Sequence, residues 1–94
     1  IVLVSQIKEH KSVPEIEQII STGTSAHGIL LALNAMNYSG IWRTGIFAFN
    51  QKVGELMGLK ENEKVIGYLY VGTPKNSPKK LDPVDTADYV TKWA

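Results

Sequence analysis

The strongest constraint on the fold comes from residues 64–73 (KVIGYLYVGT), which form the clearest β-strand pattern in the chain. Branched and aromatic side chains such as Val, Ile and Tyr favour strands because they pack well on a pleated sheet. Pro74 follows at once and predicts the end of the strand, since proline cannot donate a hydrogen bond to a sheet ladder. The chain is therefore expected to contribute at least one long strand to a sheet.

Three other segments are predicted as strands. Residues 1–7 (IVLVSQI) are apolar and rich in branched side chains, which is typical of a buried strand. A turn and a short strand are expected over 40–46. Aromatic and polar side chains alternate over 88–93, which predicts an edge strand after the Pro- and Lys-rich linker 75–83. Such an aromatic tail is expected to dock on another surface, including that of a partner subunit.

An apolar stripe at helical spacing predicts a helix of about 25 residues over 12–38. Residues 12–15 (SVPE) match a capping box with proline in the first turn. Residues 21–28 (STGTSAHG) are weak helix formers. Two interpretations stay open: a loop that separates two shorter helices, or one long helix whose small residues allow close contact with a second helix.

A short helix is predicted over residues 51–57. Asn50 is a favourable N-cap residue, because its side-chain oxygen can accept a hydrogen bond from the first turn. Gly58 can adopt the left-handed conformation that ends many helices.

The composition excludes several classes of function. The chain has no cysteine, so disulfides, thiolate catalysis and cysteine-based metal sites are excluded. A formal net charge of +1 gives no reason to expect a nucleic-acid or membrane partner. No apolar run approaches the roughly 20 residues of a transmembrane helix. A cytoplasmic location is expected, with which the absence of cysteine is compatible.

The 94 residues amount to one small domain at most. Residues 1–4 (IVLV) open directly in a buried-strand pattern, whereas natural N-termini are more often polar and loosely ordered. We therefore expect residues 1–94 to be the C-terminal half of a single larger domain, with 75–94 as an extended tail.

No catalytic or metal-binding constellation is recognisable. His10 and His27 have no partners at metal-ligand spacing, and no GxSxG motif surrounds a serine. Glu61 and Glu63 flank a turn and are expected to be solvated rather than to form an acid–base pair. The glycines of the strand at 64–73 are not a dinucleotide fingerprint, because they do not lie at a strand-to-helix turn.

Arg43 is the single arginine of the chain, and it lies in the turn 40–45 (GIWRTG). Its rigid fork of donors suits planar or phosphorylated ligands, and glycine allows the backbone to approach a ligand closely. The turn therefore predicts part of a site for a flat or phosphorylated cofactor. The alternative is that Trp42 is a core aromatic and Arg43 a surface ion-pair residue, with the lysines of the linker, including Lys75, simply solvated.

The turn 40–45, followed by 64–74 (KVIGYLYVGTP), resembles the FMN-dependent nitroreductase family, and most of all its short NAD(P)H nitroreductases. Those proteins carry a Gly-Ile/Met-Trp-Arg-Ser/Thr-Gly turn and then a Val-Gly-Phe/Tyr-Leu-Tyr-Leu/Val-Gly-Thr-Pro strand at similar spacing. The tail segments 78–83 (PKKLDP) and 88–93 (DYVTKW) are also similar to the family's ending. The resemblance covers essentially the whole chain.

The resemblance implies a nitroreductase-like α+β fold: an antiparallel-type sheet with flanking helices in an intertwined homodimer, with FMN at the subunit interface. This chain would be an incomplete part of it. The long helix would then be an interface helix, and the C-terminal strand would reach toward the partner. The family's N-terminal Arg/Ser-rich flavin-phosphate motif has no match here, so the segment alone is expected to fold poorly and to bind FMN weakly.

The resemblance also assigns residues to cofactors. The FMN contacts carried over from the turn are Trp42, Arg43, Thr44 and Gly45. Lys79 and Lys80 stand where related proteins have a basic pair, and are secondary candidates for the FMN phosphate. The helix end resembles the segment attributed to NAD(P)H binding and comprises Ala32, Leu33, Asn34, Ala35, Met36 and Asn37.

The implied activity is that of a flavin oxidoreductase, which takes a hydride from NADH or NADPH and reduces a nitroaromatic, a quinone or a similar small acceptor. No side chain is named as an acid, base or nucleophile, because the flavin does the chemistry. The alternatives are a non-catalytic flavin- or nucleotide-binding module that senses or stores cofactor, and a small interaction domain without cofactor.

Overall fold

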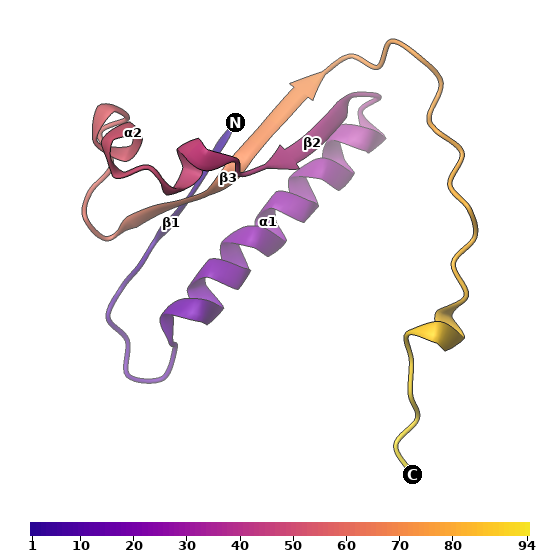
Figure 1. Cartoon of the computed structure of the whole chain (residues 1–94), viewed down its shortest axis with the longest axis horizontal. Helices are drawn as coiled ribbons and strands as arrows, with labels where there is room; N and C mark the ends of the chain where they lie inside the picture. The colour runs from indigo at the N-terminus through magenta and orange to yellow at the C-terminus, as the bar shows by residue number, and fades with distance from the viewer.

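The computed structural model describes all residues, 1–94, and has one layer of sheet with one long helix packed against it (Figure 1). The three strands are β1 (Val2–Gln6), β2 (Ser39–Arg43) and β3 (Glu63–Gly72), in the order β1-β3-β2, and both pairings are antiparallel. The predicted α+β architecture with an antiparallel sheet is confirmed. The clearest strand in the sequence, β3, is the central one, which explains why it carries the longest run of strand-forming residues.

The register of β3 differs on its two sides. Against β2 it is regular, with Trp42 opposite Leu69 and Arg43 opposite Tyr68. Against β1 it slips by one residue, because Leu3 faces Gly67 while Val4 faces Val65. Ile66 is therefore the extra residue of a β-bulge.

Helix α1 (Glu15–Ala35) is a single continuous helix of 21 residues, so the one-helix interpretation is right. Its weak central hydroxyl residues bond back into the helix: Thr22 Oγ1 donates to the Gln18 carbonyl (3.1 Å) and Thr24 Oγ1 to that of Ile20 (3.0 Å). Packing on the sheet stabilises the segment in spite of its low helix propensity.

The predicted capping box at the start of α1 is wrong. The N-cap residue is Pro14, which makes no side-chain cap, and Ser12 lies outside the helix. The Ser12 and Val13 backbone N–H groups instead donate to His10 Nδ1 at 3.1 and 3.0 Å. The approach to the helix is held by Gln18, whose side chain accepts from the Lys8 N–H at 2.9 Å and donates to the Lys8 carbonyl at 2.9 Å.

The core lies where α1 crosses the sheet. Leu3, Ala26 and Leu69 are its buried members, and Ile29 and Leu30 pack against them. Ala26 is fully buried, so a small residue is what lets the helix backbone approach the strands closely. Only 6 of the 94 residues are buried, because a single helix covers only one face of three short strands.

Helix α1 also carries three large apolar side chains that the sheet does not cover. Ile16, Ile20 and Leu31 are each 59% exposed, among polar and small residues. Exposed apolar side chains of this size are candidates for contact with a further surface. No helix of this structure combines the length and the apolar character needed to cross a membrane.

The region between β2 and β3 contains the 3₁₀ helix η1 (Ile46–Phe49) and the helix α2 (Gln51–Leu56). The Asn50 side chain accepts from the Val53 N–H at 3.2 Å, so the predicted N-cap is confirmed. Gly58 follows the helix with a φ of 76°, which confirms the predicted left-handed stop.

The predicted strand at 88–93 is wrong. After β3 the chain forms only the short 3₁₀ helix η2 (Thr86–Asp88), and it runs away from the sheet and from α1 (Figure 1). A strand needs a neighbour to receive its backbone hydrogen bonds, and no sheet edge lies beside this tail. The irregular linker at 75–83 is confirmed, and every residue from 70 to 94 is exposed.

Candidate functional site

The turn that follows β2 depends on Gly45. This residue has φ 61° and ψ −175°, a conformation that is essentially restricted to glycine. A Cβ built on it would meet nothing within 4 Å, so the backbone conformation, not space, requires glycine here. The turn brings Thr44 and Gly45 beside Arg43, the last residue of β2, before η1 begins.

A hollow of about 290 Å³ lies at this turn, on the side of the sheet away from α1. Arg43 and Tyr68 are directly paired across β2 and β3, so their side chains lie on the same face. Residues from η1 and α2 form the other walls. The full lining consists of Arg43, Thr44, Gly45, Phe47, Val53, Met57, Tyr68 and Tyr70.

The polar groups of this hollow are suited to a planar ligand with oxygen acceptors. The hydroxyl of Tyr68 is buried and has no hydrogen-bond partner in the chain. A buried polar group without a hydrogen-bond partner lowers the folding stability by about 1–3 kcal/mol, so a ligand that supplies the partner would bind favourably here. Arg43 adds a forked donor, and the aromatic rings of Phe47 and Tyr70 add flat apolar surface. The residues present therefore fit a flavin-like group.

Trp42 lies on the opposite face of the sheet. Its Nε1–H donates to the Ile66 carbonyl at 3.3 Å. A Cβ built on Gly23 of α1 would lie 3.1 Å from the edge of the indole, and one on Gly67 of β3 would lie 2.6 Å from its Cδ1 atom. The indole therefore packs between the helix and the sheet while Trp42 stays 37% exposed, and it does not line the hollow that holds Arg43.

The six residues assigned to NAD(P)H, Ala32, Leu33, Asn34, Ala35, Met36 and Asn37, form the C-terminal end of α1 and the turn after it. The turn closes with a hydrogen bond of 2.8 Å from the Tyr38 N–H to the Leu33 carbonyl, and Asn37 has a φ of 61°. This segment leads into the start of β2, whereas Arg43 is at its end, and none of the six lines the hollow.

Lys79 and Lys80 belong to the exposed tail that follows β3 and runs away from the sheet (Figure 1), and neither lines the hollow. The structure thus brings together Arg43, Thr44 and Gly45, and leaves the helix end, the two lysines and Trp42 elsewhere. The predicted residues form one site in this chain only in part.

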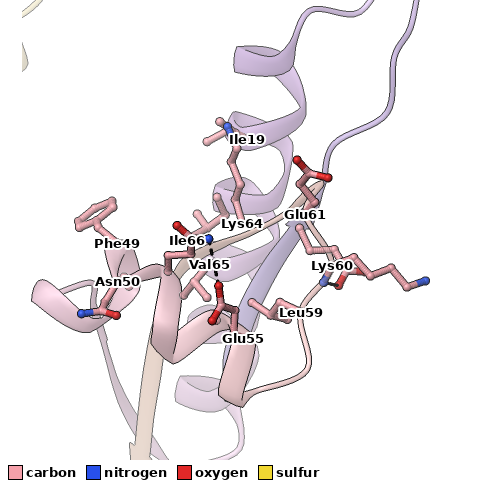
Figure 2. Close-up of a pocket in the computed structure, with 14 residues that line it drawn as sticks. Ile19, Phe49, Asn50, Glu55, Leu59, Lys60, Glu61, Lys64, Val65 and Ile66 are labelled. Atoms are coloured by element: carbon pink, nitrogen blue, oxygen red, sulfur yellow. Dashed lines mark hydrogen bonds between the residues drawn. The ribbon is translucent and has the colours of Figure 1, made fainter.

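A larger hollow, of about 950 Å³, lies between α2, the start of β3 and the first turns of α1 (Figure 2). None of the predicted cofactor residues lines it. Several of its charged groups already have partners: Glu55 accepts from the Gln51 side chain at 3.0 Å, and Glu63 accepts from the Lys60 backbone N–H at 2.9 Å. Lys64 forms an ion pair with Glu15. No group of three or more His, Asp or Glu side chains is arranged to hold a metal ion.

The sequence reasoning missed Tyr68 and Tyr70 as candidate site residues. The signal was present, because alternate residues of a strand share a face and the two tyrosines stand at alternate positions of β3. The antiparallel register with β2, which places Tyr68 opposite Arg43, was the missing fact.

Comparison with known proteins shows the family of the chain. Residues 1–73 match the sequence model of the nitroreductase family, so the chain belongs to the nitroreductase family.

Individual relatives and one solved structure support this assignment. The chain is 33% identical over 92 residues to a protein of Escherichia coli K12 named "Putative NAD(P)H nitroreductase YdjA". It is 30% identical over 80 residues, 84% of the chain, to a protein of Haemophilus influenzae with the name "Putative NAD(P)H nitroreductase". A crystal structure of a nitroreductase-like family protein from Bacillus cereus superposes with a TM-score of 0.78 at 15% identity, over 96% of this chain and 48% of that one, and it shows the same fold.

The chain spans about half the length of the relatives it matches. The match to the Escherichia coli protein covers 97% of this chain and 50% of the relative, and the match to the Haemophilus protein covers 44% of the relative.

Proposed function

We propose that the full-length protein is an FMN-dependent oxidoreductase that uses NADH or NADPH to reduce a nitroaromatic, a quinone or a similar small acceptor. Membership of the nitroreductase family and the names of the relatives support an oxidoreductase. The observation that carries the proposal on this chain is the hollow where Arg43, Thr44 and Gly45 meet Tyr68. FMN, when bound, would supply the redox chemistry: it would accept a hydride from NAD(P)H and pass electrons to the acceptor.

Four residues of the hollow have a defined task in this proposal. The Arg43 guanidinium donates to oxygen acceptors of FMN, and the Thr44 hydroxyl adds a smaller donor. Gly45 presents backbone without a side chain. The unpartnered Tyr68 hydroxyl donates to an acceptor on the cofactor, which would remove the cost of leaving it buried and unsatisfied. The protein binds and orients FMN, and no side chain serves as acid, base or nucleophile.

The remaining cofactor contacts depend on two segments that do not line the hollow in this chain, the tail and the end of α1. Lys79 and Lys80 reach the FMN phosphate when the tail docks, and residues 32–37 take part in binding NAD(P)H. The exposed apolar side chains of the tail favour docking, since Tyr89 is 78% exposed and Trp93 is 93% exposed.

The proposed assembly is a homodimer in the cytoplasm. The exposed apolar side chains of α1, which include Ile20 and Leu31, are suited to contact a second subunit. In such a dimer the hollow beside Arg43 would be completed by residues from outside this chain, which fits its open side toward solvent.

Steady-state oxidation of NADH and NADPH tests the proposed activity. The full-length protein, saturated with FMN, is mixed with each nicotinamide and with a nitroaromatic or a quinone, and absorbance is followed at the nicotinamide band. We expect acceptor-dependent turnover. Tight FMN binding without turnover would instead identify a flavin-sensing or storage module, and a protein that binds no flavin would be an interaction domain.

A further inference from the structure

The indole of Trp42 occupies a slot formed by two glycines. Gly67 of β3 lies beneath it, and a Cβ there would overlap Nε1. Gly23 of α1 lies at its far edge, where a Cβ would be 3.1 Å from Cη2, tighter than an ordinary van der Waals contact. A side chain cannot be added at either glycine without moving the ring, so the slot restricts the position of Trp42 from two sides, while 37% of the residue stays exposed.

A hydrogen bond fixes the ring in the plane of the slot. Trp42 Nε1 donates to the carbonyl of Ile66, which is the extra residue of the β-bulge and lies beyond the last β2–β3 pair at Arg43 and Tyr68. Bulges re-aim side chains and interrupt the regular ladder. The indole thus ties the end of β2 to β3 at the point where backbone pairing between the two strands stops.

Arg43 is the next residue after this fixed ring. Successive residues of a strand point to opposite faces, so a ring held on the α1 side fixes the direction of the neighbouring side chain on the hollow side. A Cβ on Gly67 would also lie 3.0 Å from the Arg43 carbonyl oxygen, so the same slot borders the Arg43 backbone.

We infer that Trp42 is a positioning residue that acts through β2 to hold Arg43 in place, and that it does not itself contact the bound cofactor. This inference rests on the proposed function, because it concerns how Arg43 binds FMN. It reassigns Trp42 from the cofactor contacts implied by family resemblance to a role on the far face of the sheet. FMN affinity should then respond to changes in the slot that touch neither FMN nor Arg43.

Gly23→Ala in the full-length protein is the decisive variant. The new methyl group presses on Trp42 from the helix side, so the ring and the end of β2 must shift by a few tenths of an ångström. Because such a shift weakens the charge-assisted contact of Arg43 without removing it, we expect FMN to bind roughly three- to tenfold more weakly. Gly54→Ala is the matched control: it is the same change in a helix, and its Cβ would lie 3.7 Å from Leu59, an ordinary contact.

The dissociation constant of FMN is measured by quenching of flavin fluorescence, and the melting temperature without FMN is recorded for every variant. Gly23→Ala is then repeated in an Arg43→Ala background. If Trp42 acts through Arg43, the effect of Gly23→Ala on FMN affinity disappears there, because the two changes are coupled. Trp42→Phe should also weaken binding in the wild type and have little effect in the Arg43→Ala background.

Three results would overturn the inference. Equal FMN affinity in Gly23→Ala and the wild type, with or without a change in melting temperature, would show that the slot is only structural. Loss of affinity in Trp42→Phe but not in Gly23→Ala would show direct contact with FMN. An effect of Gly23→Ala that persists undiminished in Arg43→Ala would exclude Arg43 as the intermediary. A wild-type protein that binds no FMN would refute the proposed function itself, which this series detects before any variant is compared.

Discussion

Arg43 and Trp42 are neighbours in sequence, and their side chains lie on opposite faces of the sheet. Arg43 pairs with Tyr68 and borders the hollow, whereas Trp42 pairs with Leu69 and enters the slot under α1. A single motif therefore contains two kinds of residue, one that borders the hollow and one that packs against α1 and β3.

Arg43→Ala is predicted to weaken FMN binding more than Arg43→Lys, with Arg43→Lys still clearly impaired. Lysine keeps the charge but loses the planar fork of donors. A charge-assisted hydrogen bond contributes about 1.5–3 kcal/mol, so the alanine variant should lose roughly ten- to a hundredfold in affinity. FMN titration of the three full-length proteins measures this. Equal affinity in the wild type and in Arg43→Ala would show that Arg43 is only a surface charge.

Gly45→Ala is predicted to destabilise the protein by about 1–3 kcal/mol, because alanine strongly disfavours φ 61° with ψ −175°. The added methyl group has free space, so the whole effect comes from the backbone. Denaturant unfolding of the full-length protein gives the value. Gly54→Ala, within α2, serves as the control and should be neutral or stabilising. A Gly45→Ala protein as stable as the wild type would mean that the turn adopts another conformation.

At the residue scale, the sequence allowed Arg43, Thr44 and Gly45 to be selected, because their types and spacing are unusual on their own. It could not show that Trp42 points away from them or that Tyr68 joins them. Those facts depend on the register of β2 against β3 and on the bulge at Ile66. Both arise from pairings between residues far apart in the sequence, such as Arg43 with Tyr68 and Leu3 with Gly67.

At the element scale, local signals predicted the elements whose ends are set locally. Asn50 and Gly58 delimit α2 as expected, and Pro74 follows the end of β3. The continuity of α1 could not be decided from propensity, because it depends on Ala26 packing into the core. The alternating pattern at 88–93 led to a wrong strand prediction, because alternating side chains form a strand only where a neighbouring strand accepts the backbone hydrogen bonds.

Helix α1 uses its small residues differently from the expected helix–helix contact. Gly23 receives Trp42 and Ala26 is buried in the core, so both face the sheet of the same chain. Gly28 is the exception, because it is exposed and a Cβ on it would meet nothing within 4 Å.

Gly28→Leu is therefore predicted to leave the packing within the chain unchanged and to disturb the proposed contact between subunits. Overpacking a tight interface costs roughly 1–3 kcal/mol, so the full-length variant should shift toward monomer or aggregate. Light scattering measures the mass, and Gly28→Ala is the control with a much smaller side chain. An unchanged dimer mass in Gly28→Leu would place the interface away from this part of α1.

At the scale of the whole molecule, the chain is open, and we expect it to be unstable alone. Its radius of gyration is 17.1 Å, whereas a compact chain of this length has one of about 12 Å. Large apolar side chains are exposed on α1, η1 and the tail, including Phe49 at 79% and Leu81 at 81%. These surfaces are the ones that a larger nitroreductase domain and a partner subunit would cover.

Residues 1–94 expressed alone are predicted to aggregate or to melt without cooperativity, and to bind FMN weakly. Complete domains have only about 5–15 kcal/mol of stability, and this chain buries only 6 residues. Calorimetry and FMN titration of the segment test this. A sharp thermal transition with micromolar or tighter FMN binding would mean that the segment is a self-sufficient domain.

The central claim, that the full-length protein is a flavin oxidoreductase of the nitroreductase family, is tested most directly by the cofactor it carries. The protein is purified, its visible absorption spectrum is recorded, and the cofactor released on denaturation is identified by chromatography. The account predicts a yellow protein that releases FMN and no FAD. A folded protein that stays colourless after incubation with excess FMN, or that releases a different cofactor, would contradict it.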